Sequence, residues 1–436
     1  MRVVVATIAE RSHFLAVVPL AWALRSAGHE VVVASQPELA GAVSAAGLPF
    51  APVGRGDVLA RVLRRLRGRS GTMEAVDWHD ARTWELPWSE LSTHMRHMVT
   101  FWWRMVNEPM VGDLVDLCRT WKPDLVVWDP ITLCAPVAAR ACGAAHVRFL
   151  WGVDTFARMR GSYLGRMEEQ VPEVREDPLG EWLSGLAARY GVEFDEELVV
   201  GQATIDQVPD VLRIPVDGRL GVRYLGMRFV PYNGRAVVPD WLRERPEGRR
   251  LCLTLGTSAT DRFGGYTLPL GEVLEALGQV DAEVVATVPL KARQDLGTVP
   301  SNVRLVDYVP LHALAATSTA TINHGGWGSV LTGLAAGLPQ AILASWFDNP
   351  MLARRLSALG AALDVPVARA TPELLADSAR RVLEDEELGR GARRIAAGIR
   401  SRPAPGELTV ELERLAARRG SVRAGAATGA PRPSER

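Results

Sequence analysis

The sequence predicts an α/β protein made of two domains, each with a parallel sheet. Short apolar runs rich in β-branched residues alternate with helical patterns, and this alternation occurs twice along the 436 residues. Strands that are apolar throughout and are each followed by a helix are typical of parallel sheets covered on both faces. A turn-rich stretch between the two sets, residues 230–239, predicts a linker.

The first set of elements begins near the N-terminus. Its expected strands are Val3–Thr7, Glu30–Ala34, Leu125–Trp128 and Ala145–Leu150. A loop over Ile8–Ser12 separates the first strand from a helix expected from about Phe14 to Ala27, which Gly28 ends. A second helix is expected over Ala135–Cys142 and is closed by Gly143.

The second set follows the linker and ends in a C-terminal helix. Its expected strands are Leu251–Leu255, Glu283–Val288, Val303–Leu305, Thr317–Asn323 and Gln340–Leu343. The expected boundaries are residues 1–229 for the first domain, 230–240 for the linker, 241–405 for the second domain and 406–419 for the C-terminal helix. Residues 420–436 are small, polar and contain proline, so we expect a disordered tail.

Composition and charge narrow the class of protein. Apolar residues make up 47% and charged residues 23%, as in ordinary globular proteins. Lys+Arg and Asp+Glu balance at 50 each, so no basic field favours a nucleic-acid partner. The four cysteines occur singly, which is typical of buried thiols in a reducing cytoplasm. The apolar run Val3–Ala9 is too short for a signal peptide or a membrane span, so we expect a cytoplasmic protein with no membrane partner.

The segment Thr321–Val330 predicts a phosphate-binding site. It places His324 between an expected strand and a helix expected over Ser329–Gly337, where free amides and the helix dipole favour negative charge. Three glycines let the backbone approach a ligand closely: Gly325, Gly326 and Gly328. A nicotinamide-type loop does not fit, because the third glycine of G-x-G-x-x-G is missing. A tight turn without a ligand explains the glycines but not the histidine beside them.

Several segments resemble one family, in order, along nearly the whole chain. They are Glu10–Leu24, Ser26–Gln36, Val230–Leu242, Leu253–Ser258, Asp307–Leu311 and His324–Asp348. In these segments the chain resembles GT-B glycosyltransferases of the antibiotic-tailoring kind, actinobacterial enzymes that attach deoxysugars to macrolides and anthracyclines. The resemblance implies two Rossmann-like domains that face each other across a cleft. The first would hold the acceptor and the second a nucleotide-diphosphate sugar.

His13 is the candidate catalytic base. It follows the first expected strand at the carboxyl end of the sheet, where ligands of open α/β sheets bind, and the catalytic base of the resembling family falls on it. Imidazole is suited to removing the proton of an acceptor hydroxyl near neutral pH, although His13 could instead cap the following helix. Asp129 is the candidate carboxylate that orients the imidazole. Asp-Pro after a strand is also an ordinary turn.

The second domain supplies the expected phosphate and base contacts of the donor. Amides and hydroxyls for the nucleotide phosphates are expected at Gly256, Thr257 and Ser258, unless these residues form a simple turn. The resemblance places the backbone of Val309 beside the edge of a pyrimidine base. It also gives Ser329 a contact with the diphosphate, and it gives His324 the role of neutralising charge on the leaving group.

The resemblance assigns the donor sugar to Asp348 and Asn349. Many relatives carry Asp-Gln or Glu-Gln at these positions and bind sugar hydroxyls with them. The shorter Asn puts that contact in doubt here, and a deoxysugar with fewer hydroxyls would explain the change.

The acceptor pocket is expected among aromatic residues of the first domain. Trp78, Trp102 and Trp151 are its candidate residues, and the density of Trp and Met around residues 78–105 suits a broad apolar pocket for a polyketide aglycone. A buried helix stripe formed by Met98, Phe101, Trp102 and Met105 is the structural alternative. In the resembling subgroup several transferases need a helper protein that is related to cytochromes P450 but lacks haem, and the segment Trp78–Trp88 is a candidate surface for it. A homodimer is also left open.

The expected reaction is a direct displacement with inversion at the anomeric carbon. The chain contains no Asp-x-Asp, so the metal-bridged diphosphate site of the other major glycosyltransferase fold has no ligands, and no metal or bound cofactor is expected. The donor implied by the resemblance is a nucleotide-diphosphate deoxysugar, in particular a dTDP-deoxysugar. A sugar-nucleotide epimerase of the same fold, a non-catalytic relative that binds glycosides or a partner, and a dinucleotide oxidoreductase are the alternatives.

Overall fold

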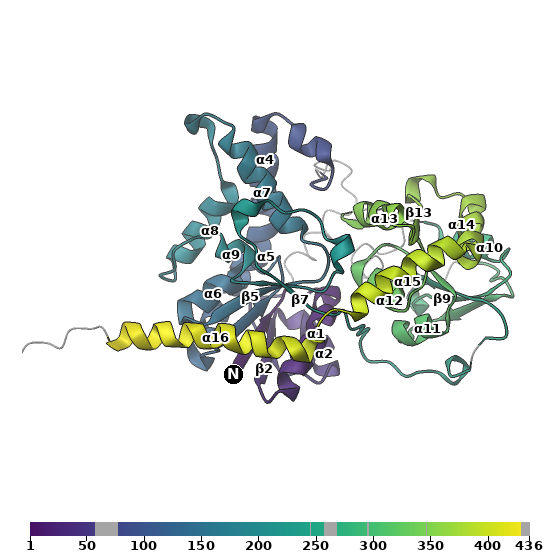
Figure 1. Ribbon diagram of the computed structural model, residues 1–436, viewed down its shortest axis with the longest axis horizontal. Helices are drawn as coiled ribbons and strands as arrows, with labels where there is room; N and C mark the ends of the chain where they lie inside the picture. The colour runs from purple at the N-terminus through teal and green to yellow at the C-terminus, as the bar shows by residue number, and fades with distance from the viewer. Residues whose placement is uncertain (57–76, 245, 257–267, 294–295, 346, 429–436) are drawn as a thin grey trace, which may run out of the picture.

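Two parallel sheets organise the chain, as the sequence predicts. The computed structural model describes residues 1–56, 77–244, 246–256, 268–293, 296–345 and 347–428. Figure 1 shows the two sheets side by side, each with helices packed on its faces. None of the helices in these ranges is both long and apolar enough to cross a membrane.

The first sheet has the strand order β3-β2-β1-β4-β5-β6-β7. Its strands are β1 Arg2–Ala6, β2 Glu30–Ser35, β3 Phe50–Pro52, β4 Leu125–Trp128, β5 Ala145–Leu150, β6 Thr204–Asp206 and β7 Tyr224–Gly226. All pairs are parallel, and Val4 lies opposite Val32 on one side and Val126 on the other. Alternate residues of β1 enter two separate buried clusters, because successive side chains of a strand point to opposite faces.

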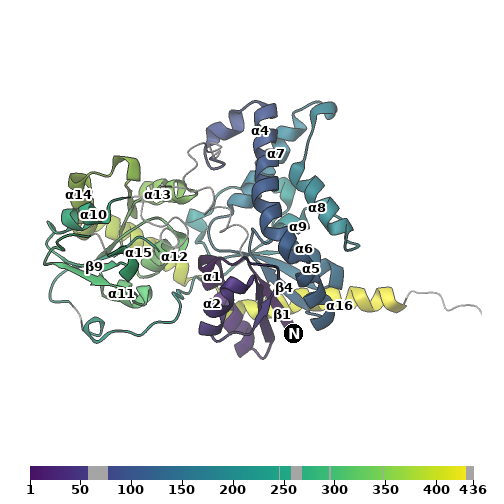
Figure 2. The same ribbon diagram turned by 180° about the vertical axis from the view of Figure 1, so that it is seen from behind.

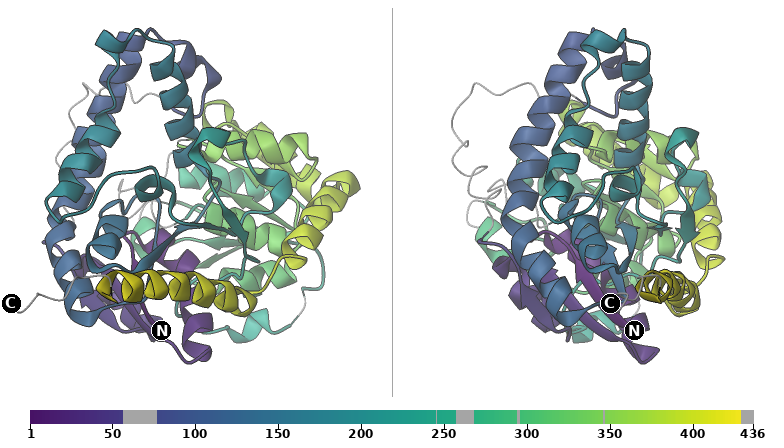
Figure 3. Two further views of the ribbon diagram at one scale, coloured as in Figure 1. Left: turned by 60° about the vertical axis from the view of Figure 1, so that its left-hand side comes forward. Right: turned by 90° about the vertical axis from the view of Figure 1, so that its left-hand side faces the viewer.

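Helices cover both faces of this sheet. They are α1 Arg11–Ser26, α2 Ala40–Ala45, α4 Trp88–Met98, α5 Arg104–Trp121, α6 Cys134–Cys142, α7 Thr155–Glu168, α8 Pro178–Ala188 and α9 Glu197–Val200. A π-helical turn, Val99–Trp103, joins α4 to α5. Figure 3 shows that α4 and α7 extend well beyond the sheet.

The second sheet has the order β10-β9-β8-β11-β12-β13. Its strands are β8 Arg250–Thr254, β9 Glu283–Thr287, β10 Val303–Val306, β11 Ala320–Asn323, β12 Gln340–Ile342 and β13 Ala362–Asp364. Its helices are α10 Leu270–Leu277, α11 Leu311–Thr317, α12 Trp327–Ala335, α13 Asn349–Ala358, α14 Pro372–Glu384 and α15 Glu386–Arg400. A buried cluster joins side chains of both halves, among them Val153 and Phe229 from the first and Trp327 and Leu331 from the second.

The last helix, α16 Pro405–Thr428, returns to the first sheet. It crosses below that sheet in Figure 1, and Figure 2 shows the same path from behind. Its residues Leu408, Leu412 and Leu415 are buried with α1 and the strands, and Glu413 pairs with His29 at 2.9 Å. The helix runs past residue 420, where the sequence predicts a disordered tail, because alanine and arginine, which predominate from residue 416 on, are strong helix formers. Residues 429–436 lie outside the described ranges.

Three element boundaries near the site differ from those expected. The first helix begins at Arg11 rather than Phe14, since Glu10 is its N-cap and accepts from Ser12 N. His13 therefore lies in the first turn of α1, not in a loop. The strand expected over Thr317–Asn323 begins only at Ala320, after α11. The helix expected from Ser329 begins two residues earlier, at Trp327, with Gly326 as its N-cap.

Candidate active site

His13 and Asp129 come together at the carboxyl ends of two neighbouring strands. His13 Nδ1 lies 3.8 Å from Asp129 Oδ2, and the two side chains are only 12% and 6% exposed. The pairing follows from the topology, because β1 and β4 are adjacent and parallel and each residue lies shortly after its strand. This distance is too long for a hydrogen bond, so the two groups attract each other as charges only when His13 is protonated.

Asp129 is held as a carboxylate by its surroundings. Burial alone would raise its pKa, but nearby His13, the Thr7 hydroxyl and the Ile131 N–H together hold the pKa below its usual range. Asp129 Oδ2 accepts from the hydroxyls of Thr7 at 2.5 Å and Thr132 at 3.1 Å, and Oδ1 accepts from Ile131 N at 2.8 Å. Asp129 is therefore consistent with both interpretations of the Asp-Pro pair. It forms hydrogen bonds within its own turn, and it also faces His13.

Asn107 supports this loop, and sequence reasoning missed it. Asn107 is fully buried in α5, and its Oδ1 accepts from Cys134 N at 2.9 Å at the start of α6. Its Nδ2 donates to Ile131 O at 2.9 Å. The available signal was a lone amide among the apolar residues of this segment, because buried polar side chains need partners.

Trp151 covers the imidazole of His13. The indole and imidazole centroids are 4.4 Å apart, and the planes are inclined by 20°. Phe156 lies against Trp151 in an edge arrangement at 6.3 Å. One face of Trp151, an expected acceptor residue, thus packs against the candidate base His13.

The other two expected acceptor residues pack against the core of the first sheet. Trp78 and Trp102 are partly buried there, and Trp78 also contacts Trp84 with centroids 5.5 Å apart. Of the helix stripe expected over residues 98–105, Met98, Trp102 and Met105 pack partly buried against the core, whereas Phe101 is 57% exposed. The π-helical turn shifts the buried side to Val99 and Trp103.

His324 lies between two glycines of the expected phosphate loop. A Cβ at Gly256 would stand 2.5 Å from His324 Cε1, and one at Gly326 would stand 2.4 Å from Nε2, so a side chain at either position would clash with the ring. Burial lowers the pKa of His324 to about 4, against the opposing effect of the Thr254 carbonyl. The histidine is therefore neutral at neutral pH without a ligand, whereas the sequence suggested a ready cation.

The start of α12 presents backbone amides, as expected of a phosphate site. Two amides of the loop are occupied: Gly325 N donates to Asn323 Oδ1 at 2.9 Å, and Ser329 N donates to Gly326 O at 3.0 Å. No described residue accepts from the N–H groups between them, those of Gly326, Trp327 and Gly328. Thr257 and Ser258 lie outside the described residues.

Asp348 and Asn349 close the other side of the loop. Asn349 Nδ2 donates to His324 O at 3.0 Å, so this amide supports the phosphate loop. Asp348 Oδ2 accepts from Trp327 Nε1 at 2.6 Å. Burial raises the pKa of Asp348 to about 6, although the Trp327 hydrogen bond and the charge of His13 oppose the change. Trp151, which stacks on His13, also contacts Phe347, the residue before Asp348, with ring centroids 6.4 Å apart, so the two halves of the site lie close together. The side chain of Val309 is buried in a small cluster with Cys252 and Leu314.

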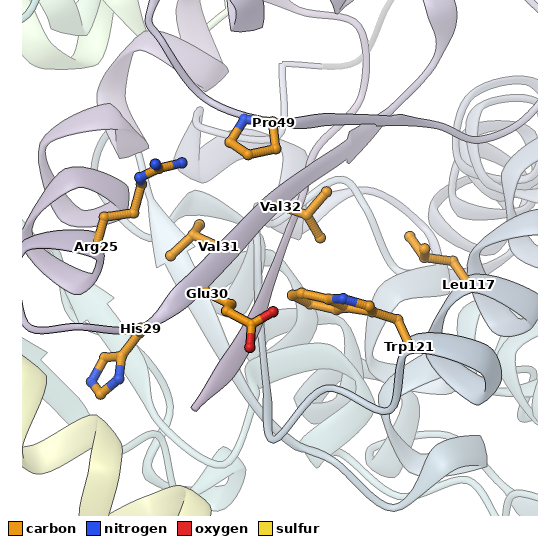
Figure 4. A pocket seen from close by; sticks show the side chains of 8 residues that line it. All are labelled: Arg25, His29, Glu30, Val31, Val32, Pro49, Leu117 and Trp121. Carbon is orange, nitrogen blue, oxygen red and sulfur yellow. The ribbon is translucent and has the colours of Figure 1, made fainter.

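A separate pocket of about 420 Å³ lies away from this site. Figure 4 shows its wall, with Leu117 and Trp121 of α5 on one side and Arg25 on the other. His29 and Glu30 place it at the beginning of β2, the opposite edge of the sheet from His13. It contains none of the residues expected to carry the chemistry.

Comparison with known proteins gives the family. Residues 22–256 match the N-terminal domain, and residues 271–415 the C-terminal domain, of the erythromycin biosynthesis protein CIII-like family. The chain is 41% identical over 419 residues to the 10-deoxymethynolide desosaminyltransferase of Streptomyces venezuelae, covering 96% of this chain and 97% of that protein. It is 41% identical over 430 residues to the aclacinomycin-T 2-deoxy-L-fucose transferase of Streptomyces galilaeus, covering 96% of each. The glycosyltransferase VinC, solved in complex with dTDP, superposes with a TM-score of 0.85 at 37% identity, covering 96% of this chain and all 100% of VinC.

The two parallel-sheet domains and the match to VinC define a GT-B glycosyltransferase. This confirms the fold and the class of enzyme that the resemblance implied. The chain belongs to the erythromycin biosynthesis protein CIII-like family of antibiotic glycosyltransferases.

Proposed function

We propose that this enzyme transfers a deoxysugar from a dTDP-linked donor to a hydroxyl group of a polyketide aglycone, with inversion at the anomeric carbon. The 3.8 Å contact between His13 and Asp129 carries the proposal. The contact supports the proposal, because His13 acting as a base would have an ionised partner, and amides at the start of α12 in the second domain could bind a diphosphate.

His13 removes the proton of the acceptor hydroxyl, and the oxygen attacks the anomeric carbon. Asp129 stabilises the imidazolium that forms, because it stays ionised next to the ring. The nucleoside diphosphate leaves from the opposite face of the sugar. The amides of α12 and the His324 ring would bind the growing negative charge there.

The substrates of related proteins support the proposed donor and acceptor classes. The desosaminyltransferase is named for 10-deoxymethynolide and another relative for aclacinomycin T, while VinC and the spinosyn rhamnosyltransferase SpnG have been solved with thymidine diphosphate. The corresponding substrates are proposed for this chain on the strength of its identity to those proteins over nearly its whole length.

The test is transfer of sugar from dTDP-deoxysugars to macrolide and anthracycline aglycones by the full chain, followed by mass spectrometry. The configuration of the product is read by NMR. His13→Ala should keep dTDP binding and lower turnover by about two to four orders of magnitude, the usual contribution of a general base. Turnover of that variant within about tenfold of the parent would show that His13 is not the base. Isomerised donor without an acceptor product would favour the epimerase.

A further inference from the structure

A row of polar side chains crosses three neighbouring strands of the first sheet. Arg148 of β5 lies opposite Thr204 of β6, and Thr204 lies opposite Tyr224 of β7. Arg148 and Thr204 are fully buried, and Arg148 Nε donates to Thr204 Oγ1 at 3.2 Å. Buried strands of parallel sheets usually carry apolar side chains, so a polar row at this depth calls for a task.

The row meets at Asp154, a buried residue between β5 and α7. Arg148 Nη2 and the Tyr224 hydroxyl both donate to Asp154 Oδ2, the latter at 2.9 Å. Burial and the nearby charge of Asp154 raise the pKa of Tyr224, so its hydroxyl keeps the proton that it donates. Asp154 Oδ1 accepts from Ala157 N at 3.1 Å and so caps α7. The carboxylate is therefore held by two strands and one helix at once.

Asp154 stands at the far end of the loop that covers the candidate base. This loop comprises residues 151–153, and its first residue, Trp151, stacks on His13 with ring centroids 4.4 Å apart. At the near end the loop leaves β5, whose last residue is paired with β6. A loop this short has few conformations left when both of its ends are fixed, so the indole keeps its place on the imidazole.

We propose that Asp154 is a positioning residue for sugar transfer, and that Arg148 and Tyr224 hold it in place for this task. By fixing the loop, Asp154 keeps Trp151 against His13, so the imidazole meets the acceptor hydroxyl in one orientation. A buried ion pair contributes little to stability compared with apolar side chains of similar size, so placement of the loop accounts for the pair better than stability does. This inference rests on the proposed function, because it requires His13 to be the base.

Tyr224→Phe is the test variant, because it removes one hydrogen bond of Asp154 and keeps the ring. Tyr163→Phe is the matched control, since the buried Tyr163 also donates one hydrogen bond of 2.9 Å, to Glu176 O, elsewhere in the first domain. Transfer rates are divided by the fraction of molecules that bind dTDP in calorimetry, so partial unfolding does not count. Tyr224→Phe should lower kcat by about fivefold to fiftyfold and leave the KM for the donor unchanged, because a small misplacement of a base can cost up to about a hundredfold. Tyr163→Phe should change neither constant.

A spectroscopic measurement follows the stacked rings without reference to turnover. In protein labelled with carbon-13 at histidine Cε1, the face of the Trp151 indole should shift the His13 Hε1 signal upfield, and His13→Ala identifies that signal. Tyr224→Phe should move the signal toward its position in Trp151→Leu, and Asp154→Asn should move it further. Tyr163→Phe should leave it in place.

The results separate the inference from the function on which it rests. A His13 signal that stays in place in Tyr224→Phe would overturn the inference, and so would a displaced signal with normal turnover. Tyr224→Phe alone decides if Asp154→Asn does not fold. Nearly full activity of His13→Ala would instead refute the proposed function, whatever the position of the histidine signal in the other variants.

Discussion

Asp129→Asn tests how the proposed base is stabilised. When His13 accepts a proton, it becomes an imidazolium 3.8 Å from the Asp129 carboxylate. At an effective dielectric constant of about 20, two unit charges this far apart attract by about 4 kcal/mol. Each increment of about 1.4 kcal/mol is about tenfold in rate, so the variant should turn over up to about a thousandfold more slowly.

The amide keeps the shape of the carboxylate, so the change removes charge more than structure. Thr132→Val is the matched control, because the Thr132 hydroxyl bonds the same Asp129 Oδ2 at 3.1 Å and carries no charge. The loss of this one hydrogen bond should slow turnover by no more than about tenfold.

The assay is the single-turnover rate with the enzyme in excess over the donor and the acceptor saturating, measured by rapid quench and mass spectrometry. Asp129 is proposed to act through His13, so adding Asp129→Asn to His13→Ala should not slow the reaction further. The reasoning fails if Asp129→Asn alone stays within about threefold of the parent, or if its effect is undiminished when His13 is absent.

Two further predictions concern the second domain. His324→Ala should weaken dTDP binding, measured by calorimetry, and should also lower turnover, because the ring faces the proposed leaving group in ground and transition states alike. EDTA should leave the activity of the parent unchanged. A strict need for magnesium would contradict a diphosphate site that works without metal. Asp348→Asn should raise the free energy of unfolding in urea by up to about 3 kcal/mol at pH 8 and should leave it unchanged at pH 4. Folding raises the pKa of the Asp348 carboxyl from 3.8 to about 6, so the ionised group costs stability as the pH rises through that window. Equal effects at the two pH values would show that the buried charge is not the cause.

Every described strand of four or more residues could be predicted from the sequence, and most of the three-residue strands could not. β4 Leu125–Trp128 has the expected bounds because it is a continuous apolar run, as is typical of a strand buried on both faces. β5 Ala145–Leu150 also has the expected bounds, although it contains the buried polar residues His146 and Arg148. The missed strands β3, β6, β7 and β13 have three residues each. Runs that short carry no periodicity, and only pairing with a neighbour makes them strands.

The residues of the site also differ in how well the sequence predicts them. Glycines and histidines at the ends of strands could be found, because parallel topology brings those ends to one edge. Contacts across long sequence separations could not be found, since packing alone creates them, as with Asn107 under the Asp129 loop and Trp151 on His13.

The loop after β5 shows what such contacts add, because it serves both halves of the site at once. Trp151 stacks on the base, while the next residue, Gly152, leaves space for Trp327, whose ring atoms would lie 2.5 Å from a Cβ at that position. Trp327 in turn donates to Asp348. A change in the distance between the two domains would therefore move His13 and Asp348 relative to each other. We expect catalysis to depend on closure of the two domains, because the enzyme must exclude water from an activated sugar.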